Sequence, residues 1–252
     1  MKTRLDAELV RRGLARSREA ATDLIAAGKV LVTGMPASKA ATQVDAQTSI
    51  TLKDDHAEFV SRGGHKLSGA LDEFAGVVVN GKIALDAGAS TGGFTDCLLQ
   101  RGAKQVVAID VGKSQIHERI ASNERVVVID GFNVRQLLDD TQDLPEPLRD
   151  AFDVVVADLS FISLTSVSQA LTARISANGD LVVLVKPQFE ATKREVDKSK
   201  GVIADQAIRD RVIGEVNESF ASEGWVVRGC IESPIHGAEG NVEYLVWYRF
   251  KA

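Results

Sequence analysis

The stretch LDAGASTGGFTD, residues 85–96, decides the fold of the larger part of this chain. It starts in an apolar run, KIALDAG (82–88), and leads into FTDCLLQRG (94–102), which has helical character. The glycines between them let the backbone approach a bound ligand closely. Their spacing departs from the regular G-x-G-x-x-G pattern, which disfavours a dinucleotide. Asp86 puts a carboxylate at the strand end, where it can face a ligand's amino group.

Six further apolar runs follow: KQVVAIDVG (104–112), ERVVVIDG (124–131), AFDVVVADLS (151–160), GDLVVLVKP (179–187), GWVVRGCIE (224–232) and VEYLVWYRF (242–250). Runs rich in valine and isoleucine that alternate with helical segments indicate a mostly parallel sheet covered on both faces. The link SPIHGAEGN (233–241) is too short for a crossover helix, so the last strand should be antiparallel. This α/β class, with a seven-stranded Rossmann-like sheet, is ordinary for S-adenosylmethionine-dependent methyltransferases.

Open sheets of this kind bind ligands at the carboxyl ends of their strands. Asp110, at the end of the second strand, is placed to bind ribose hydroxyls with two acceptor oxygens. Asp130, at the end of the third, is placed to contact an adenine amine, with Phe132 against the ring. A turn or capping role stays open for both aspartates. The residues expected to bind the cofactor, S-adenosyl-L-methionine, are Asp86, Gly88, Ala89, Ser90, Thr91, Gly93, Phe94, Asp110, Val111, Asp130, Gly131 and Phe132.

Charged residues also follow the later strands. Asp158 ends the fourth strand, Lys186 ends the fifth, and Glu243 opens the antiparallel one, whose start lies at the edge where the parallel strands end. A charge after a buried run is costly unless it is paired or functional. We therefore expect the three side chains to converge, either as catalytic groups or as a purely structural network.

The segment before residue 57 has a different character. Residues 1–30 hold seven basic and four acidic residues within a chain of net charge −5. RLDAELVRRGL (4–14) and SREAATDLIAAG (17–28) predict two short helices, capped by Ser17 and stopped by Gly13 and Gly28, and VLVTG and SITL predict strands. This small α+β domain resembles the RNA-binding domain of ribosomal small-subunit protein four and of pseudouridine synthases. The resemblance favours an RNA-phosphate patch of Arg4, Arg16, Arg18 and Lys29 over a merely solvated helix face.

The motif SRGGHKL (61–67) completes the pattern with Lys66. Lys66, Asp158, Lys186 and Glu243, in this order around DAGASTGGF, resemble the lysine, aspartate, lysine, glutamate tetrad of FtsJ/RrmJ-class RNA ribose 2′-O-methyltransferases. The motifs VVADLSFISL, LVKPQFE and GNVEYLVW extend the likeness, and the whole chain is similar to the TlyA family of ribosomal RNA methyltransferases, also labelled hemolysins. An exposed loop charge is the alternative for Lys66.

The resemblance implies transfer of a methyl group from S-adenosylmethionine to a ribose 2′-hydroxyl, with cytidine as the family's preference, in ribosomal RNA within ribosomal subunits. Lys186 is then either the base or a charged group that stabilises the developing alkoxide. Arg62, before the glycine pair, is expected to touch the RNA backbone.

The implied domains are an RNA-binding domain (1–56), a linker (57–62) and a methyltransferase domain (63–252). The linker reads Ala57-Glu58-Phe59-Val60 where longer family members have Arg-Ala-Trp-Val, which puts signalling through that arginine in doubt. The sequence runs to RFKA soon after the last strand, as in the shorter type of member, which acts on the large subunit alone. REVDKSKGVIAD (194–205) is expected to be a mobile loop beside the site.

Other classes find less support. Cys97 and Cys230 lack paired spacing, so neither a disulfide framework nor a metal site is expected, and no cysteine stands where a cytosine C5 methyltransferase needs a nucleophile. Asp158-Leu-Ser-Phe161 is not the motif of a base-amine methyltransferase. A nicotinamide dehydrogenase, an inactive RNA-binding protein and a membrane-lytic protein remain the alternatives. With no apolar run of membrane length and no signal peptide, we expect a cytoplasmic protein. The large, shaped RNA substrate implied by the resemblance favours a monomer.

Overall fold

The computed structural model describes residues 3–15, 17–45, 48–52, 59–237 and 239–251. The chain forms two compact units, residues 1–58 and 59–252. The second unit takes in part of the predicted linker, since Phe59 is buried in its core and the helix α3 begins at Arg62.

The smaller unit is the predicted α+β domain. Its helices are α1 (Leu5–Arg11) and α2 (Arg18–Ala26), and its strands are β1 (Thr3–Arg4), β2 (Val30–Val32), β3 (Met35–Pro36), β4 (Gln43–Val44) and β5 (Ile50–Leu52). Ser17 caps α2 as predicted, because its hydroxyl accepts a hydrogen bond from the Ala20 amide at 3.1 Å. Leu5, Leu9 and Ile25 form the centre of a small apolar core. A unit with so few core residues depends also on its polar contacts.

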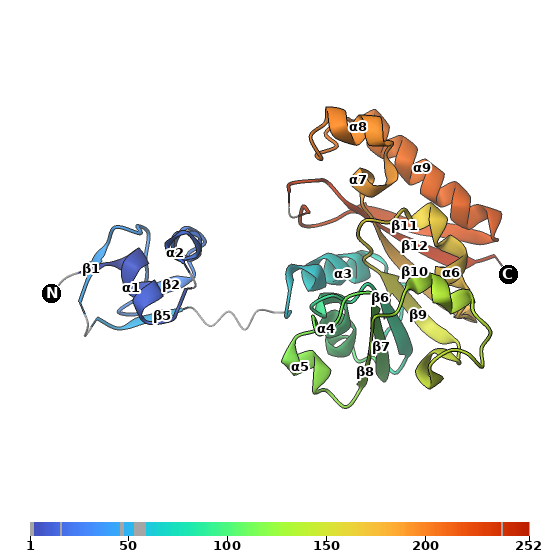
Figure 1. The fold of residues 1–252 in the computed structure, drawn as a ribbon, viewed down its shortest axis with the longest axis horizontal. Helices are drawn as coiled ribbons and strands as arrows, with labels where there is room; N and C mark the ends of the chain where they lie inside the picture. Colours follow the sequence, from blue (N-terminus) through green and yellow to red (C-terminus); the bar gives the residue numbers. More distant parts are fainter. Residues whose placement is uncertain (1–2, 16, 46–47, 53–58, 238, 252) are drawn as a thin grey trace. The chain divides into compact units, whose positions relative to one another are not determined.

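The larger unit contains the predicted seven-stranded sheet (Figure 1). Its strands are β6 (Ile83–Ala87), β7 (Gln105–Asp110), β8 (Val126–Asp130), β9 (Phe152–Ala157), β10 (Ile175–Val185), β11 (Trp225–Glu232) and β12 (Tyr244–Phe250), in the spatial order β11-β12-β10-β9-β6-β7-β8. The neighbouring strands β10, β9, β6, β7 and β8 pair in parallel, whereas β12 is antiparallel to both β10 and β11. The prediction of an antiparallel last strand is therefore confirmed.

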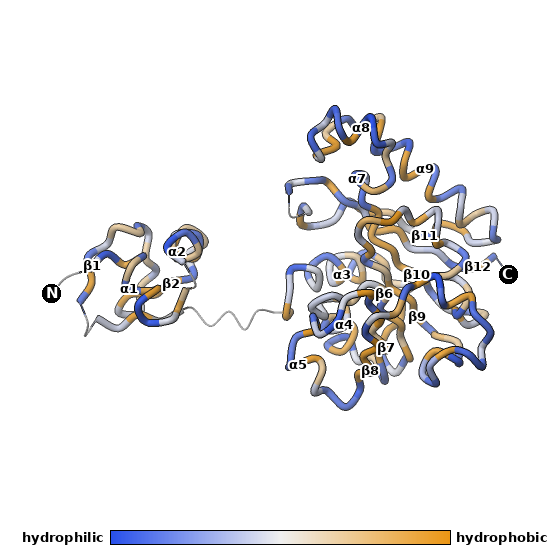
Figure 2. The backbone as a smooth tube through the Cα atoms, viewed as in Figure 1, coloured by the Kyte–Doolittle hydropathy of each residue, from blue (hydrophilic) through white to orange (hydrophobic). Residues whose placement is uncertain are grey.

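Helices cover both faces of this sheet. One apolar cluster packs α3 (Arg62–Glu73), α4 (Gly93–Gln100) and α5 (Glu118–Ala121) against one face, through residues such as Leu67, Leu98 and Ile120. The other packs α6 (Ser168–Thr172) and α9 (Gln206–Ser222) against the opposite face, through residues such as Leu171 and Phe220. The apolar tube segments in Figure 2 are concentrated along the strands between these layers. Because both faces are covered, the strands are continuous apolar runs.

Two short helices follow β10, namely α7 (Pro187–Glu190) and α8 (Lys193–Lys198). The helix α8 corrects the prediction of a loop for residues 194–198, whereas residues 199–205 are a turn and an irregular connection to α9. Thr192 and Glu195 form a capping box, in which the Thr192 hydroxyl accepts from the Glu195 amide and the Glu195 carboxylate accepts from the Thr192 amide. The motif T-x-x-E at residues 192–195 is the sequence signal for this helix start.

Candidate active site

The four tetrad residues meet at the carboxyl edge of the sheet. Asp158 directly follows β9 and Lys186 directly follows β10. Glu243 directly precedes β12, and since Tyr244 pairs with Val185, Glu243 and Lys186 are neighbours at this edge. Lys66 comes from the second turn of α3. The predicted convergence of strand-end charges is present in the structure.

The four side chains form two ion pairs. Lys66 Nζ lies 2.5 Å from Glu243 Oε2, and Lys186 Nζ lies 2.6 Å from Asp158 Oδ1. Lys186 Nζ also donates a hydrogen bond to Ser160 Oγ at 2.8 Å and lies 5.7 Å from the ring centre of Phe189. Lys66, Lys186 and Glu243 are buried, with 9%, 8% and 3% exposure. Charges this deeply buried must stay paired, and each lysine has a carboxylate of its own.

The tetrad borders a cavity of about 240 Å³. Lys66, Asp158 and Lys186 line it, together with Arg62. Of the predicted cofactor-binding residues, it is lined by Gly88, Ala89, Ser90, Thr91, Gly93 and Phe94. Ser61, Ser160 and His236 also line it and were not predicted from the sequence. Of these three, only Ser160 could have been predicted from the sequence, because it stands two residues after Asp158 in the same motif.

The first turn of α3 fits closely against the glycine-rich loop. A Cβ atom on Gly64 would lie 2.2 Å from the Phe59 ring, and one on Gly93 would lie 2.2 Å from Ser61 Oγ. Gly64 therefore lets α3 approach Phe59, and Gly93 lets the loop approach the start of α3. Both glycines of SRGGHKL lie within α3. Arg62 Nη2 donates a hydrogen bond to the His236 carbonyl at 2.9 Å, which joins α3 to the β11–β12 connection.

A second cavity of about 570 Å³ lies next to the first. The two share Gly88, Ser90, Asp158 and Ser160 as lining residues. The larger one is also lined by Asp110, Val111 and Phe132, all predicted cofactor residues, and by residues that were not predicted, among them Gln115, Asn133 and Phe161. Phe161 is 90% exposed and has a left-handed φ of 63°, with its ring 5.1 Å from that of Phe189.

Asp110 holds the turns around the larger cavity. Its Oδ2 accepts a hydrogen bond from the Ser90 amide at 2.9 Å, and its Oδ1 accepts one from the Gly112 amide at 2.6 Å. Asp110 thus has the turn role that the sequence left open, and it also lines the larger cavity. Asp130 accepts from the Ser114 amide at 2.8 Å, and neither it nor Gly131 lines either cavity.

Asp86 is placed differently from the expectation. Its side chain has no exposed surface and lines neither cavity. Its Oδ2 accepts from Thr95 Oγ1 at 2.6 Å, which ties the end of β6 to the first turn of α4. Its Oδ1 is buried and makes no hydrogen bond. Burial raises the pKa of Asp86 to about 7.

The basic residues of the smaller unit are partly neutralised within it. Arg4 and Arg18 both pair with the buried Asp6 at 2.9 Å, and the hydrogen bond from Arg4 holds the pKa of this carboxyl well below its usual range. Both arginines stay about half exposed. Lys29 is exposed. Arg16 lies outside the described residues.

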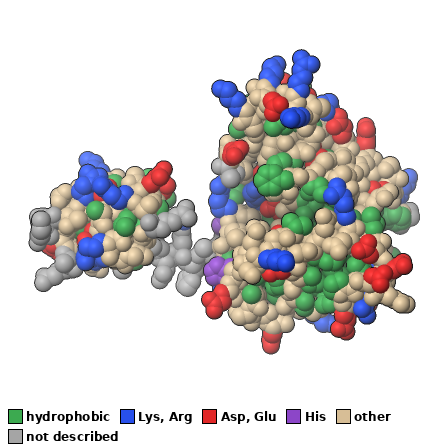
Figure 3. All heavy atoms as spheres, viewed as in Figure 1, with side chains coloured by type: hydrophobic (Ala, Val, Ile, Leu, Met, Phe, Trp, Pro, Cys, Tyr) green, Lys and Arg blue, Asp and Glu red, His purple; other side chains and the backbone are tan. Residues whose placement is uncertain are grey.

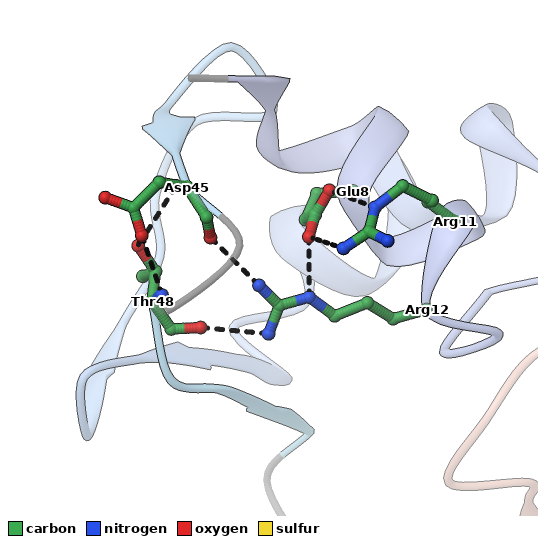
Figure 4. A network of polar contacts seen from close by, with 5 residues as sticks. All are labelled: Glu8, Arg11, Arg12, Asp45 and Thr48. Atoms are coloured by element: carbon green, nitrogen blue, oxygen red, sulfur yellow. Dashed lines mark hydrogen bonds and ion pairs between the residues drawn. The ribbon is translucent and has the colours of Figure 1, made fainter. Parts of the chain in front are cut away.

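A second network in this unit is structural (Figure 4). Glu8 is buried and accepts from Arg11 and Arg12, and these hydrogen bonds lower its pKa. Arg12 also donates to the carbonyls of Thr48 and Asp45, at 2.9 Å and 3.0 Å. The guanidinium thereby connects α1 to the turn before β5. Arg12 therefore has a structural role, although a count of charges alone would assign it to a binding surface.

Neither a metal centre nor a membrane-spanning helix is present among the described residues of the two units. No group of three or more His, Cys, Asp or Glu side chains is arranged there to hold a metal ion. In the same described residues, no helix has the length and apolar character needed to cross a bilayer.

The fold and the site together define a methyltransferase of the FtsJ-like class. Residues 59–250 match the family model described as FtsJ-like methyltransferase, and residues 3–50 match the S4 domain. The chain is 49% identical to the 16S/23S rRNA (cytidine-2′-O)-methyltransferase TlyA of Mycobacterium tuberculosis, over 98% of this chain and 90% of the relative. The chain thus belongs to the TlyA family.

Two further relatives agree with this assignment. The 23S rRNA (cytidine-2′-O)-methyltransferase TlyA of Campylobacter jejuni is 32% identical over 75% of this chain and 70% of the relative. A solved structure of a hemolysin-named protein from Streptococcus thermophilus superposes with a TM-score of 0.74 at 35% identity, covering 99% of this chain and 89% of that one.

Proposed function

We propose that this protein transfers a methyl group from S-adenosylmethionine to the 2′-hydroxyl of a cytidine in 23S ribosomal RNA. The observation that carries the proposal is the two ion pairs, Lys66–Glu243 and Lys186–Asp158, beside a small cavity that adjoins a larger one. The larger cavity is of a size that holds a nucleoside-like cofactor, and the smaller one presents the charged groups that a reacting hydroxyl needs.

The residues around the larger cavity fit the cofactor. Asp110 supplies a carboxylate at a strand end, where ribose hydroxyls are bound in such sheets, and Phe132 supplies an apolar wall. Gly88 has a φ of 84°, and a Cβ atom there would lie 2.5 Å from the Asp158 carbonyl oxygen, so the loop leaves room only for backbone. When bound, S-adenosylmethionine supplies a methyl group on a positively charged sulfur, which is already activated for transfer.

Lys186 is the residue that we propose acts on the ribose hydroxyl. A 2′-hydroxyl is a poor nucleophile, so it must be held in line with the methyl carbon and its developing negative charge must be stabilised. The ion pair with Asp158 and the hydrogen bond to Ser160 fix the position of Lys186 Nζ beside the cavity. Of the two roles left open by the sequence, this geometry favours a charged lysine that orients the hydroxyl oxygen and stabilises the alkoxide.

Lys66 and Glu243 complete the charge balance of the site. The ion pair holds the Lys66 ammonium at the cavity wall, on the side of α3. Glu243 itself does not line the cavity. We propose that Lys66 assists in placing the ribose and that Glu243 positions Lys66.

The choice of substrate rests on the relatives. Both the Mycobacterium tuberculosis and the Campylobacter jejuni proteins are named for cytidine 2′-O-methylation of 23S rRNA, and only the first is also named for 16S rRNA. The large-subunit RNA is therefore the substrate they share. Because ribosomal subunits are its substrate, we propose that the protein works in the cytoplasm, as a monomer.

The test is to incubate separated ribosomal subunits with the protein and methyl-labelled S-adenosylmethionine, and then to map the modified ribose by its block to reverse transcription. We expect label in the large subunit, at one cytidine. The Lys186→Ala variant should lose transfer while keeping cofactor affinity within about twofold, and Lys104→Ala, an exposed lysine away from both cavities, is the control. Label on neither subunit would refute the proposal, and label on the small subunit as well would extend its substrate range.

A further inference from the structure

The helix α8 and the turn after it form an exposed basic surface. We name Lys193, Arg194, Lys198 and Lys200 the α8 patch, and all four residues are exposed. The larger unit has 21 basic and 27 acidic residues, a net charge of −6, yet four of those basic residues fall within eight positions. In Figure 3 the blue side chains of lysine and arginine gather over α8. The patch is a local positive surface on an acidic unit.

Internal contacts occupy Glu195, one of the two carboxylates of α8, while the other, Asp197, is exposed beside the patch. Glu195 accepts hydrogen bonds from the Thr192 amide and hydroxyl, at 2.9 Å and 2.7 Å, and from Arg211 Nη2 at 2.8 Å. The Thr192 hydrogen bonds and the Arg211 charge keep its pKa below the usual range, so it is ionised and already satisfied. Within the described chain, none of the four patch residues forms an ion pair. The fold leaves these cations available to a partner.

The patch also lies close to the proposed active site along the chain and borders a groove. Lys193 follows Lys186 by seven residues, so their backbones are at most about 25 Å apart. Arg194 and Lys198 line a cavity of about 670 Å³ between α8 and the start of α9, whose wall also holds the carboxylates Glu195 and Asp205. Cations at this distance can contact the phosphates of the same RNA whose ribose occupies the site.

We propose that the α8 patch binds backbone phosphates of the ribosomal RNA substrate, as a second RNA-binding surface in addition to the S4 domain. The proposal rests on the proposed function for the identity of the RNA. An RNA backbone suits the patch because phosphates are spaced, exposed anions that lysine and arginine bind without base contacts. A lipid surface suits it less, because Val196 is the only apolar residue among the six of α8.

The test compares two triple variants that remove equal charge. The first is Lys193→Gln/Arg194→Gln/Lys198→Gln, and the second is Lys104→Gln/Arg228→Gln/Lys251→Gln, whose residues are also exposed basic side chains of the larger unit. Binding to 23S ribosomal RNA is measured by fluorescence anisotropy from 0.05 to 0.5 M salt, without cofactor. Cofactor affinity and the unfolding midpoint of each variant serve as folding checks.

Each lost phosphate contact lowers the magnitude of the slope of log affinity against log salt by about 0.7 to 0.9. We therefore expect this slope to be smaller by about 2 for the α8 variant, and its binding near 0.15 M salt to be roughly 50-fold weaker. The single variant Arg194→Gln should lose about 0.8. Equal slopes and affinities for the two triple variants would overturn the proposal, as would patch-dependent binding to anionic vesicles but not to RNA. If the wild-type protein binds RNA through the patch yet methylates no ribosomal RNA, the proposed function fails while this inference stands.

Discussion

The buried pair of Lys66 and Glu243 leads to a prediction about stability. The lysine side chain is 11% exposed and the glutamate side chain 3%, with 2.5 Å between Nζ and Oε2. From the sequence alone, removal of Lys66 would be expected to cost turnover and little stability. In the structure, Lys66→Met leaves the Glu243 carboxylate buried without its cation, which costs about 3 to 5 kcal/mol. For a unit of this size, that lowers the unfolding midpoint by roughly 10 °C.

The double variant separates charge from packing. Lys66→Met/Glu243→Gln removes the stranded charge and keeps the shape of both side chains, so we expect it to recover about half of the lost stability or more. Neither variant should transfer methyl groups at more than a small fraction of the wild-type rate, since both lack the Lys66 ammonium.

Tryptophan fluorescence during urea unfolding measures this stability directly. Both tryptophans of the chain, Trp225 and Trp247, lie in the larger unit, so the signal is independent of the S4 domain. The reasoning is refuted if Lys66→Met costs less than about 1 kcal/mol, or if the double variant is no more stable than the single one. In the first case the pair is hydrated in solution, and in the second the loss comes from packing.

Three further perturbations test other parts of the site. Gly88→Ala should lower cofactor affinity at least tenfold by titration calorimetry, because the new methyl group meets the Asp158 carbonyl at 2.5 Å, whereas Gly81→Ala, also at positive φ but in open space, should leave it unchanged. Asp86 has a folded pKa raised to about 7, so its neutral form stabilises the fold below pH 3.8 and this stability is lost as the pH rises to 7. The free energy of unfolding of Asp86→Asn, measured in urea, should therefore rise by about 3 kcal/mol relative to that of the wild type between pH 5 and pH 8. A difference in unfolding free energy that does not change with pH would contradict the raised pKa. Asn241→Ala removes buried hydrogen bonds of 2.9 Å and 2.8 Å to the segment before α9, and should lower the transfer rate by loosening the connection to Glu243, with cofactor affinity kept as the internal control.

Much of the fold followed from the sequence pattern. Seven apolar runs and one short connection were enough to predict the sheet and the direction of its last strand. The place of Glu243 followed from that direction, because the start of an antiparallel strand lies where its parallel neighbours end.

The orientation of side chains could not be predicted in the same way. Strands buried on both faces show no alternation of apolar and polar residues. The sequence therefore could not indicate that the Asp86 side chain points to Thr95 of α4 and away from the cavities. Charge counting failed in the smaller unit for a related reason. A count subtracts Asp6 and Glu8 from the total, but it cannot tell which arginines they hold in place.

The insertion of β12 between β10 and β11 also affects when the site is completed during synthesis of the chain. Glu243 is made 177 residues after the lysine that it neutralises. At about 5 to 20 residues per second, that interval lasts roughly 10 to 35 s. Throughout it, Lys66 has no Glu243, and β10 lacks a neighbour on one side. A chain whose synthesis has not yet passed Glu243 therefore lacks one of the four tetrad side chains, and the site is complete only when the last strand has been made.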